Sequence, residues 1–189
     1  RKADPFLEGI SGEGFQNDDP FSVHALIVPD RKSVMKDDVD LSKYSELLLK
    51  DIDEEYGGFK GAPKFMMPNN LEFLLRYSVQ NQQENSKNKI LKSLNMMAYG
   101  GIFDHVEGGF SRYSTDERWH VPHFEKMLYD NGQLMSLYSV GYRISKSELY
   151  KQTIYKIHEY INSEMKDFSG GYYSSLDADS KLEDGSYAE

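Results

Sequence analysis

The chain has no cysteine, only one tryptophan and no long apolar run. Without cysteine it has no disulfide, no thiolate zinc site and no catalytic thiol. This does not fix the compartment, for which the cytoplasm is our working expectation. No stretch is apolar enough to suggest a membrane span. The net charge of −9, with no basic cluster to offset it, argues against nucleic-acid binding.

The remaining composition is that of a soluble globular domain. The 189 residues are 39% hydrophobic and 28% charged, enough for one domain with a sizeable core. The N-terminal RKADPFLEGI contains neither an initiating methionine nor a signal-peptide core, and the chain stops in the polar stretch DGSYAE. We expect both ends to be processed or cut. Residues 1–40 are rich in Asp, Gly and Pro, apart from a strand expected over 23–28, and are interpreted as a linker or domain remnant.

From residue 41 onward the apolar residues recur at helical spacing and predict five successive helices. The expected N-caps are Asp40, Asn69, Ser86 and Ser145, and the fourth helix is expected to start directly after Pro122. The predicted inward-facing residues are Leu41, Tyr44, Leu47, Leu48 and Ile52; Leu71, Leu74, Leu75 and Val79; Ile90, Leu91, Leu94 and Met97; Phe124, Met127, Leu128, Leu134, Leu137 and Tyr138; and Leu149, Ile154, Ile157 and Ile161. The predicted fold class is therefore mainly α, built of helical hairpins.

Three long connections share a composition. DEEYGGFKGAPKFMMPN, GGIFDHVEGGFSRYSTDERWHVP and SGGYYSSLDADSKLEDGSYAE each combine Gly-Gly with aromatic and acidic residues. Long loops in a compact helical protein are usually functional. If the hairpins stack side by side, these loops gather on one face and line a common mouth.

Three segments resemble a known family. GGFKGAPKF (57–65), GGIFDHVEGGFSRYSTDERWHVPHFEKMLYDNGQL (100–134) and GGYYSSLDADS (170–180) are similar to motifs of the YyaL-like group of spermatogenesis-associated, thioredoxin-domain-containing proteins. The resemblance implies that 41–189 is the N-terminal part of an (α/α) barrel, an incomplete toroid resembling six-hairpin glycosidases and N-acylglucosamine epimerases. It also implies that 1–40 is a linker or the remnant of a thioredoxin-like domain, although the chain has no thioredoxin active-site motif.

The chain departs from the family pattern at several positions. Glu107 and Ser111 replace a glycine and a histidine, and His120 replaces an apolar residue. The HFEK tetrad (123–126) and the DADS segment are intact. The role of a histidine at position 111 therefore does not carry over, whereas that of the tetrad does.

His123 is the first candidate for catalysis. Expected at a helix N-terminus, it would be held as a neutral imidazole able to take a proton. At helical spacing His123 and Lys126 share a face, and Glu125 points away from it. In one interpretation His123 is an acid/base group in a sugar-sized cleft. In the other the segment only starts the helix, with Glu125 bonding backbone N–H groups.

Other candidates also have two interpretations each. Asp104 and Asp177 would supply the acid and base of glycoside chemistry if the fold brings them roughly 5–10 Å apart; otherwise they form ion pairs that stiffen polar loops. Trp119 and Tyr113 would stack on a sugar ring or pack between hairpins. A metal site at His120-x-x-His123 is disfavoured by the intervening proline, and no phosphate-binding glycine motif is present, so neither metal nor cofactor is expected.

By resemblance we expect a carbohydrate-active domain that acts on a sugar or sugar derivative by acid/base chemistry. The alternative is a non-catalytic interaction or regulatory module attached to a thioredoxin-like domain. The expected partners are a small sugar and the thioredoxin-like domain of the parent chain, with no nucleic acid or membrane. The candidate catalytic residues are His123, Asp104 and Asp177, and the candidate substrate-binding residues are Arg112, Tyr113, Trp119, Glu125, Lys126, Asp130, Asp179 and His105.

Overall fold

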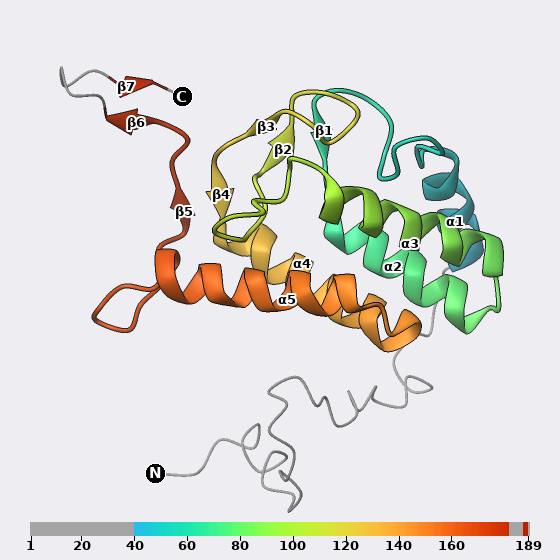
Figure 1. Cartoon of the computed structure of the whole chain (residues 1–189). Helices are drawn as coiled ribbons and strands as arrows, with labels where there is room; N and C mark the ends of the chain where they lie inside the picture. The colour runs from blue at the N-terminus through green and yellow to red at the C-terminus, as the bar shows by residue number, and fades with distance from the viewer. Residues whose placement is uncertain (1–39, 182–186, 189) are drawn as a thin grey trace, which may run out of the picture. The chain divides into compact units, whose positions relative to one another are not determined.

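The computed structural model describes residues 40–181 and 187–188 (Figure 1). The contacts divide the chain into Arg1–Val39 and Asp40–Glu189, and the strand predicted over 23–28 lies outside the described residues. Within the described part the five predicted α-helices are present. They are α1 (Leu41–Lys50), α2 (Pro68–Gln80), α3 (Glu84–Tyr99), α4 (Leu128–Ser145) and α5 (Glu148–Tyr160), which a π-helical turn, η2 (Ile161–Met165), extends. None of the helices in this part is long and apolar enough to cross a membrane.

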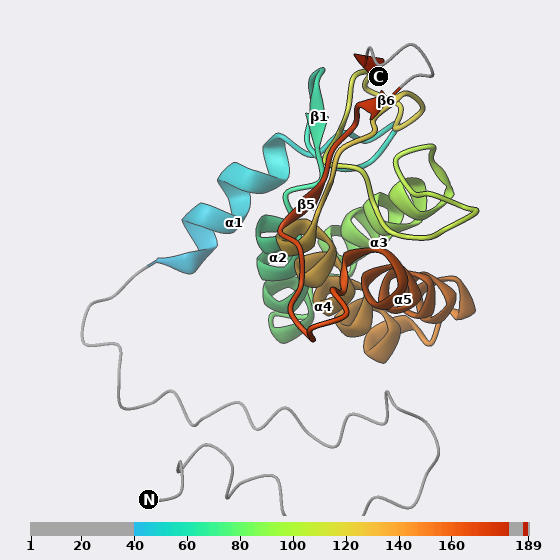
Figure 2. The same cartoon turned by 90° about the vertical axis from the view of Figure 1, so that its left-hand side faces the viewer.

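The helices pair into two hairpins, α2–α3 and α4–α5, which pack side by side with α1 against α2 (Figure 2). Two tyrosines on the second hairpin tie it to the first, because Tyr138 and Tyr150 donate to the carbonyls of Leu94 and Leu91 at 2.8 and 2.9 Å. The predicted stripes supply most of this core. Leu71, Leu74, Leu75, Ile90, Leu94, Met97, Leu134, Leu137, Tyr138, Ile154 and Ile157 are all at most 3% exposed.

The inward face predicted for the first helix is wrong for Leu41, Tyr44 and Leu47, whereas Ile52, just after the helix, is buried as predicted. Leu41, Tyr44 and Leu47 are 41, 57 and 51% exposed, whereas Ser45 is buried. The reason is the position of α1 at the edge of the helical layer, where α2 covers only one narrow side of it.

The helix starts follow backbone geometry more than side-chain capping. Asp40 caps α1 as predicted, accepting from the backbone N–H of Ser42 at 3.1 Å. However, α2 begins at Pro68 rather than after Asn69, because the fixed φ of proline suits the first helical position. Similarly, α3 is preceded by Gln83 rather than Ser86.

The predicted cap of α5 is also shifted by two residues. Ser147, not Ser145, precedes α5. The hydroxyl of Ser145 donates to the carbonyl of Gly141 one turn back in α4, at 2.9 Å, and so belongs to the end of the preceding helix.

The start of α4 differs most from the prediction. Pro122–His123 form strand β3 and Lys126–Met127 form strand β4, so the helix begins only at Leu128. The HFEK tetrad is therefore extended, and the helix-dipole argument for His123 does not apply. Extended backbone also places successive side chains on opposite sides, so His123 and Glu125 share a side and Lys126 points away from both.

Short strands join the three long connections at one end of the helices. In the first sheet, β1 (Lys64–Phe65) pairs antiparallel with β2 (Tyr113–Ser114), which pairs antiparallel with β3. In the second, β4 pairs with β5 (Ser175–Leu176), and β6 (Ser180–Lys181) pairs with β7 (Tyr187–Ala188) in a third. Since β1, β2 and β5 come from different connections, the loops gather on one face as predicted (Figures 1 and 2).

A similar compact turn, which we name the Asp–Gly–Gly turn, lies in or directly before each long connection, with one residue fewer in the third copy. Turn 1 spans 53–58, turn 2 spans 104–109 and turn 3 spans 167–171. In every copy the aspartate N–H donates to the carbonyl of the second glycine, at 2.8 or 2.9 Å, and the first glycine N–H donates back to the aspartate carbonyl, at 2.9 or 3.0 Å. The weak internal periodicity of the sequence is thus a structural repeat.

The glycines of turns 2 and 3 are expected to differ sharply in tolerance to alanine. Gly109 and Gly170 both have positive φ, at 78° and 93°. A Cβ on Gly109 would lie 2.5 Å from the buried ring of Tyr160, whereas one on Gly170 would meet nothing within 4 Å. Gly170→Ala should cost about 1 kcal/mol of strain, and Gly109→Ala about 1–3 kcal/mol more for overpacking. Urea denaturation measures both, and equal losses would contradict the packing described.

Candidate active site

An aromatic row crosses the first sheet. The register aligns Phe65, Tyr113 and His123 across β1, β2 and β3, so their side chains share one face. Ring centroids are 5.0 Å apart for Phe65 and Tyr113 and 4.8 Å apart for Tyr113 and His123, with the last two rings nearly parallel at 17°. Phe65 is 43% exposed, so the row presents aromatic surface to solvent.

An ion pair lies beside this row. Arg112 and Glu125 are joined by an N–H to carbonyl bond of 2.8 Å and by an Nη1–Oε2 contact of 3.0 Å. The same Oε2 is 3.8 Å from Nε2 of His123. Glu125 raises the pKa of the Arg112 guanidinium, which keeps a fixed positive charge here. The predicted candidates Arg112, Tyr113, His123 and Glu125 are therefore brought together.

Asp130 adds a titratable carboxyl to this group. It lies in the first turn of α4 and faces a cavity of about 210 Å³ that Arg112 also lines. Burial raises the pKa of Asp130 to about 6; Arg112 opposes the rise and Glu125 adds to it. A carboxyl with this pKa exchanges a proton near neutral pH, which general acid/base catalysis requires.

The cavity suits a small polar molecule with an apolar face. It combines an arginine, an acid and three side-chain amides with one aromatic ring and sulfur-containing or proline side chains. The lining residues are Phe65, Met66, Met67, Pro68, Asn69, Asn70, Arg112, Asp130 and Gln133. A sugar offers hydroxyls for the polar groups and a C–H face for the ring of Phe65.

Asn131 fixes the position of Asp130. It is completely buried, its Oδ1 accepts from the N–H of Phe110 at 2.7 Å, and its Nδ2 donates to the carbonyls of Phe110 and Met127, each at 3.0 Å. These bonds tie the first turn of α4 to the loop after α3. The neighbouring acid is thus carried on a rigid element, as a functional group needs.

Asp104 lies in turn 2 and Lys126 pairs with it, and neither residue lines the cavity. Oδ2 of Asp104 accepts from Nζ of Lys126 at 2.8 Å, and its Oδ1 accepts from the N–H groups of Val106 and Glu107. Partial burial tends to raise the pKa of Asp104, but these hydrogen bonds outweigh it and lower the pKa. An acid held ionised by an almost buried lysine is well suited to stiffen a loop and poorly suited to donate a proton.

Trp119 and His105 make hydrogen bonds within and between the long connections and do not line the cavity. Trp119 is completely buried and donates from Nε1 to the carbonyl of Tyr56 at 2.9 Å, so its ring faces are covered by protein. Its predicted role in stacking on a sugar is not supported by this position. His105 is exposed, with Nε2 3.1 Å from the carbonyl of Gly100.

Asp177 and Asp179 follow β5 and are exposed. The N–H of Asp179 donates to Oδ1 of Asp177 at 3.4 Å. Among the described side chains, neither carboxyl contacts the Arg112–Glu125 pair. Across residues 40–181 and 187–188 no group of three His, Cys, Asp or Glu side chains is placed to hold a metal ion.

Several site residues were missed by sequence reasoning. Phe65 lies within the GGFKGAPKF motif but not among the aromatic candidates, and Asn69 was assigned to a cap although it lines the cavity. Asn70 and Gln133 carried no distinguishing signal. A usable signal was the position of Asn69 and Asn70 directly after a Pro at a helix start, next to the long connection before it.

Comparison with known proteins finds relatives in sequence and neighbours in fold. No family model matches the chain. It is 47% identical over 148 residues to spermatogenesis-associated protein 20 of Mus musculus, covering 76% of this chain and 19% of that protein. It is 50% identical over 137 residues to the Homo sapiens protein of the same name, covering 70 and 17%. The chain therefore spans about a fifth of the length of the curated relatives it matches.

Solved structures with the same fold include sugar epimerases. The chain matches cellobiose 2-epimerase from Spirochaeta thermophila with a TM-score of 0.60 at 16% identity, covering 73% of this chain and 40% of that one. It matches cellobiose 2-epimerase from Bacillus thermoamylovorans with a TM-score of 0.56 at 13% identity, covering 78 and 40%. The predicted fold class, helical hairpins of an (α/α) barrel, is confirmed. The chain is thus similar in sequence to the spermatogenesis-associated protein 20 relatives and shares the helical-hairpin fold of these epimerases.

Proposed function

We propose that this domain binds a sugar or sugar derivative in the cavity beside Arg112 and Asp130 and acts on it by acid/base chemistry. The observation that carries the proposal is Asp130, a half-buried carboxyl with a pKa raised to about 6. It faces a cavity that is also lined by the positively charged side chain of Arg112. The structural neighbours include a cellobiose 2-epimerase and another sugar epimerase, which favours a sugar over other small polar molecules.

Each group has a defined role in this proposal. Asp130 accepts a proton from the substrate and later returns one, so the protein ends the cycle unchanged. Arg112 donates hydrogen bonds to substrate oxygens and stabilises negative charge that develops on them. The row of Phe65, Tyr113 and His123 offers its exposed edge to the C–H face of the ring. This assigns proton transfer to Asp130 in place of Asp104 and Asp177, and leaves His123 as a second acid/base group.

The wider assignment follows from the sequence relatives. We propose that the chain is part of a YyaL-like, spermatogenesis-associated protein, whose thioredoxin-like domain is the partner of this barrel. The identity of 47% to the mouse protein supports the relationship. A partner of this kind is compatible with either a catalytic or a regulatory barrel.

A sugar that occupies the cavity is expected to stabilise the chain against heat. At 100 times its Kd a ligand adds about 2.7 kcal/mol, which raises Tm by several degrees in a domain of this size. A panel of neutral sugars, amino sugars and sugar phosphates in a thermal-shift assay measures this. Binders are then incubated with the protein in D₂O, and NMR detects deuterium incorporated at carbon.

The panel separates the two function classes. Stabilisation together with deuterium incorporation supports the acid/base reading, and stabilisation alone supports a sugar-binding module. A well-folded protein that no sugar stabilises would refute the proposal and favour the non-catalytic interaction module.

A further inference from the structure

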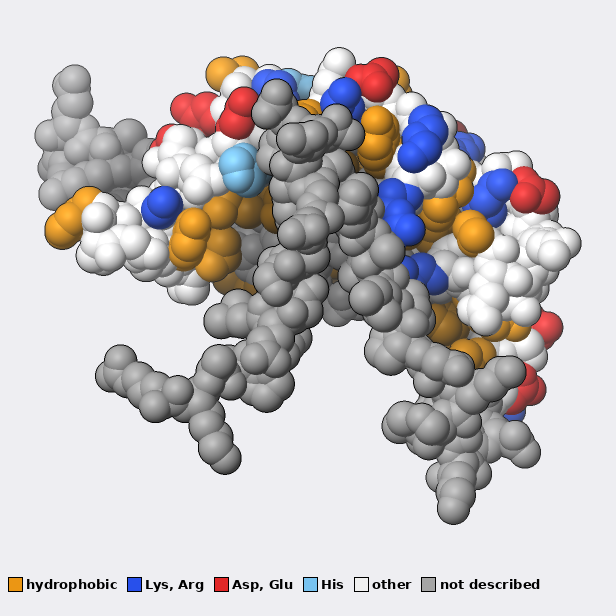
Figure 3. Space-filling model, turned by 90° about the horizontal axis from the view of Figure 1, so that it is seen from below, with side chains coloured by type: hydrophobic (Ala, Val, Ile, Leu, Met, Phe, Trp, Pro, Cys, Tyr) orange, Lys and Arg blue, Asp and Glu red, His pale blue; other side chains and the backbone are white. Residues whose placement is uncertain are grey.

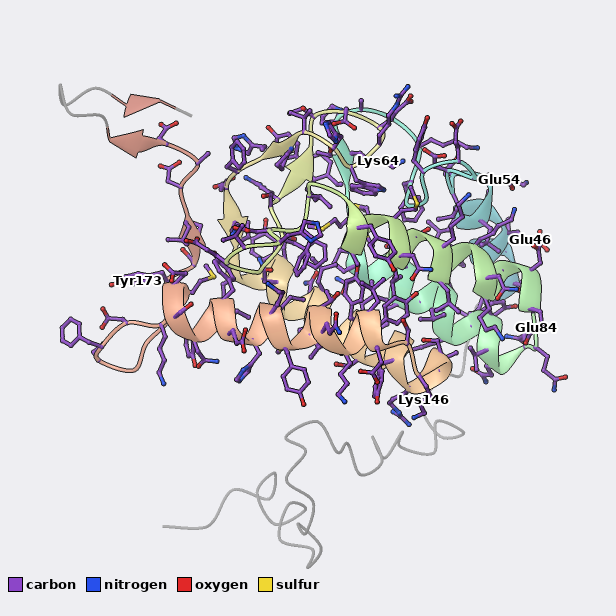
Figure 4. The ribbon with its side chains drawn as sticks, viewed as in Figure 1. Glu46, Glu54, Lys64, Glu84, Lys146 and Tyr173 are labelled. Carbon is purple, nitrogen blue, oxygen red and sulfur yellow. The ribbon has the colours of Figure 1, made fainter. Side chains whose placement is uncertain are left out.

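A second cavity lies beside the one that Arg112 and Asp130 line. The first, which we name the Asp130 cavity, is about 210 Å³, and the second, which we name the Phe59 cavity, is about 420 Å³. The Phe59 cavity lies between the end of α1, the first long connection and the start of α2, next to Lys64, which Figure 4 shows beside β1. Its lining residues are Leu48, Asp51, Phe59, Lys60, Pro63, Lys64, Phe65, Met67 and Asn70.

The two cavities share part of their lining. Phe65, Met67 and Asn70 line both of them. Phe65 is 43% exposed and Met67 is 44% exposed, so these two side chains form an open ridge between the cavities rather than a buried wall. A ligand in the Asp130 cavity therefore has a short path over this ridge into the Phe59 cavity.

The backbone of Met67 is strained at this ridge. Its φ of 46° is in the left-handed region, which a residue with a branched or bulky side chain rarely adopts. Met66 is 2% exposed, so the strained backbone buries one methionine and presents the next one between the two cavities. Strain of this kind is found at ligand sites, and the flexible methionine side chain adapts to the shape of a ligand.

The Phe59 cavity is more apolar than the Asp130 cavity. Five of its nine lining residues are apolar, including the two aromatic rings of Phe59 and Phe65. On the opposite side of the helices, seen from below, apolar side chains are instead interspersed with charged ones (Figure 3). Apolar surface is thus gathered in a hollow directly beside the candidate active site.

The two ammonium groups of the Phe59 cavity already have partners within the protein. Nζ of Lys64 pairs with Oδ2 of Asp53 at 2.6 Å, and the Lys64 side chain is only 1% exposed. Nζ of Lys60 donates to the carbonyl of Lys50 at 2.7 Å. A ligand group in this cavity therefore meets mainly apolar side chains.

The Asp130 cavity alone is small for a ligand site. Sites for small molecules usually measure about 300–1,000 Å³. At about 210 Å³ the Asp130 cavity is below this range, whereas the two cavities together fall within it. A ligand of ordinary size thus occupies both, with its polar part beside Arg112 and Asp130 and its apolar part beside Phe59.

We propose that the Phe59 cavity binds an apolar group carried by the sugar, so that the ligand is a sugar with an apolar substituent rather than a free sugar. The sugar ring lies in the Asp130 cavity, and the substituent crosses the ridge of Phe65 and Met67 to contact Phe59 and Leu48. Its burial among these side chains supplies the affinity. This rests on the proposed function, because the sugar ring occupies the same site in both.

The proposal is tested with glucose, mannose and N-acetylglucosamine, each free and with one benzyl group, using a separate probe for each sugar oxygen. Binding to the 189-residue chain is followed by NMR of isotope-labelled Leu and Met methyl groups. Met66 reports on the Asp130 cavity and Leu48 on the Phe59 cavity, because each lines only one of the two. We expect a free sugar to shift the Met66 signal alone. A benzyl derivative should shift both signals and bind at least about tenfold more tightly.

The two signals distinguish failure of this proposal from failure of sugar binding. Benzyl derivatives that shift Met66 alone, or that bind no more tightly than the free sugar, would overturn the proposal and leave the sugar site intact. A shift of Leu48 without Met66 would also overturn it, because the ligand would not span both cavities. If no probe shifts Met66, both the sugar site and this proposal are refuted.

Two variants change the Phe59 cavity from different elements. Phe59→Leu removes a ring from the first long connection, and Leu48→Phe fills space from α1. Each is expected to abolish most of the gain from the benzyl group and to leave the affinity for the free sugar unchanged. Phe73→Leu is the matched control, because Phe73 is also partly buried but lines neither cavity, and it should bind both ligands as wild type does.

Circular dichroism shows whether the three variants are folded. If Phe59→Leu and Leu48→Phe both keep the full gain from the benzyl group, the Phe59 cavity is not its binding site. An equal loss of affinity for the free sugar and its benzyl derivative would contradict the proposal as well, because the effect would not be specific to the apolar group.

Discussion

Replacing Asp130 by asparagine is expected to lower the proposed acid/base activity strongly and to stabilise the protein at the same time. The activity falls about 10²–10⁴-fold, because the amide cannot exchange a proton with the substrate. The free energy of unfolding rises because the variant lacks a carboxyl whose ionised form is disfavoured by burial in the folded state. Its pKa is about 6 in the folded protein against an ordinary value of 3.8, so the folded protein binds more protons between these values.

The pH dependence gives this prediction its signature. The wild-type free energy of unfolding should fall, relative to that of Asp130→Asn, as pH rises from about 4 to about 6, and then stay constant. Since Asp130 is only half-buried, we expect a plateau difference of about 1–2 kcal/mol. Urea denaturation between pH 4 and pH 8 measures it. Asp177→Asn is the control, because an exposed carboxyl should change neither quantity.

Two results would contradict the assignment. A difference between Asp130→Asn and wild type that does not vary with pH would mean that Asp130 is not held with a raised pKa. Loss of activity in Asp177→Asn but not in Asp130→Asn would return proton transfer to the segment after β5.

Trp119→Ala is expected to destabilise the chain by about 3–5 kcal/mol, the usual cost of removing a large, completely buried side chain. The indole also donates to the carbonyl of Tyr56 and covers the ammonium of Lys64, so both groups lose a partner. Because a loss of this size approaches the whole stability of many domains, circular dichroism must accompany the denaturation curves.

Comparison with an exposed ring separates packing from ligand binding. Tyr172→Ala, at a residue 48% exposed, should change stability by less than about 0.5 kcal/mol. Trp119→Phe keeps a ring but not the N–H donor, so its loss of stability should lie between those of Trp119→Ala and Tyr172→Ala. If Trp119→Ala remained as stable as wild type and lost sugar binding, Trp119 would be a residue that stacks on the sugar, contrary to the packing described.

Apolar periodicity predicted the helices well because the spacing of apolar residues along a helix is a local property of the sequence. Most of the stripe residues predicted for α2, α3, α4 and α5 are buried, including Leu74, Leu94, Leu137 and Ile157. The prediction is wrong for Val79 and Phe124, which are 43 and 59% exposed; Phe124 lies in the extended segment before α4. It failed for α1 because periodicity shows which side is apolar and not whether a neighbour covers it. Capping motifs were less reliable, since Asn69 and Ser86 lie inside helices whose starts are set elsewhere.

The candidate site depended on pairings that the sequence does not contain. Arg112, His123 and Glu125 were predicted as site residues, with His123 and Glu125 at the start of a helix. Instead the pairing of strand β2 with strand β3 brings the three residues together. Phe65 joins them only because β1 pairs with β2, across nearly fifty positions of the chain. Asp130 was included among the candidates, but its raised pKa reflects burial and two neighbouring charges that only the fold assembles.

The Asp–Gly–Gly turns 1 and 2 are packed under residues that come much later in the chain, because Trp119 covers Gly58 and Tyr160 covers Gly109. This order affects how the protein folds while it is being synthesised. Turn 1 is complete only when Trp119 reaches it, and turn 2 only when Tyr160 does, so each turn waits for residues made more than fifty positions later. On a ribosome adding about 5–20 residues per second, the aspartate of each new turn stays solvated for several seconds until the next hairpin emerges. A chain that grows in this way folds from its N-terminus one hairpin at a time. During a pause in translation, only the most recently made hairpin is not yet packed against its turn.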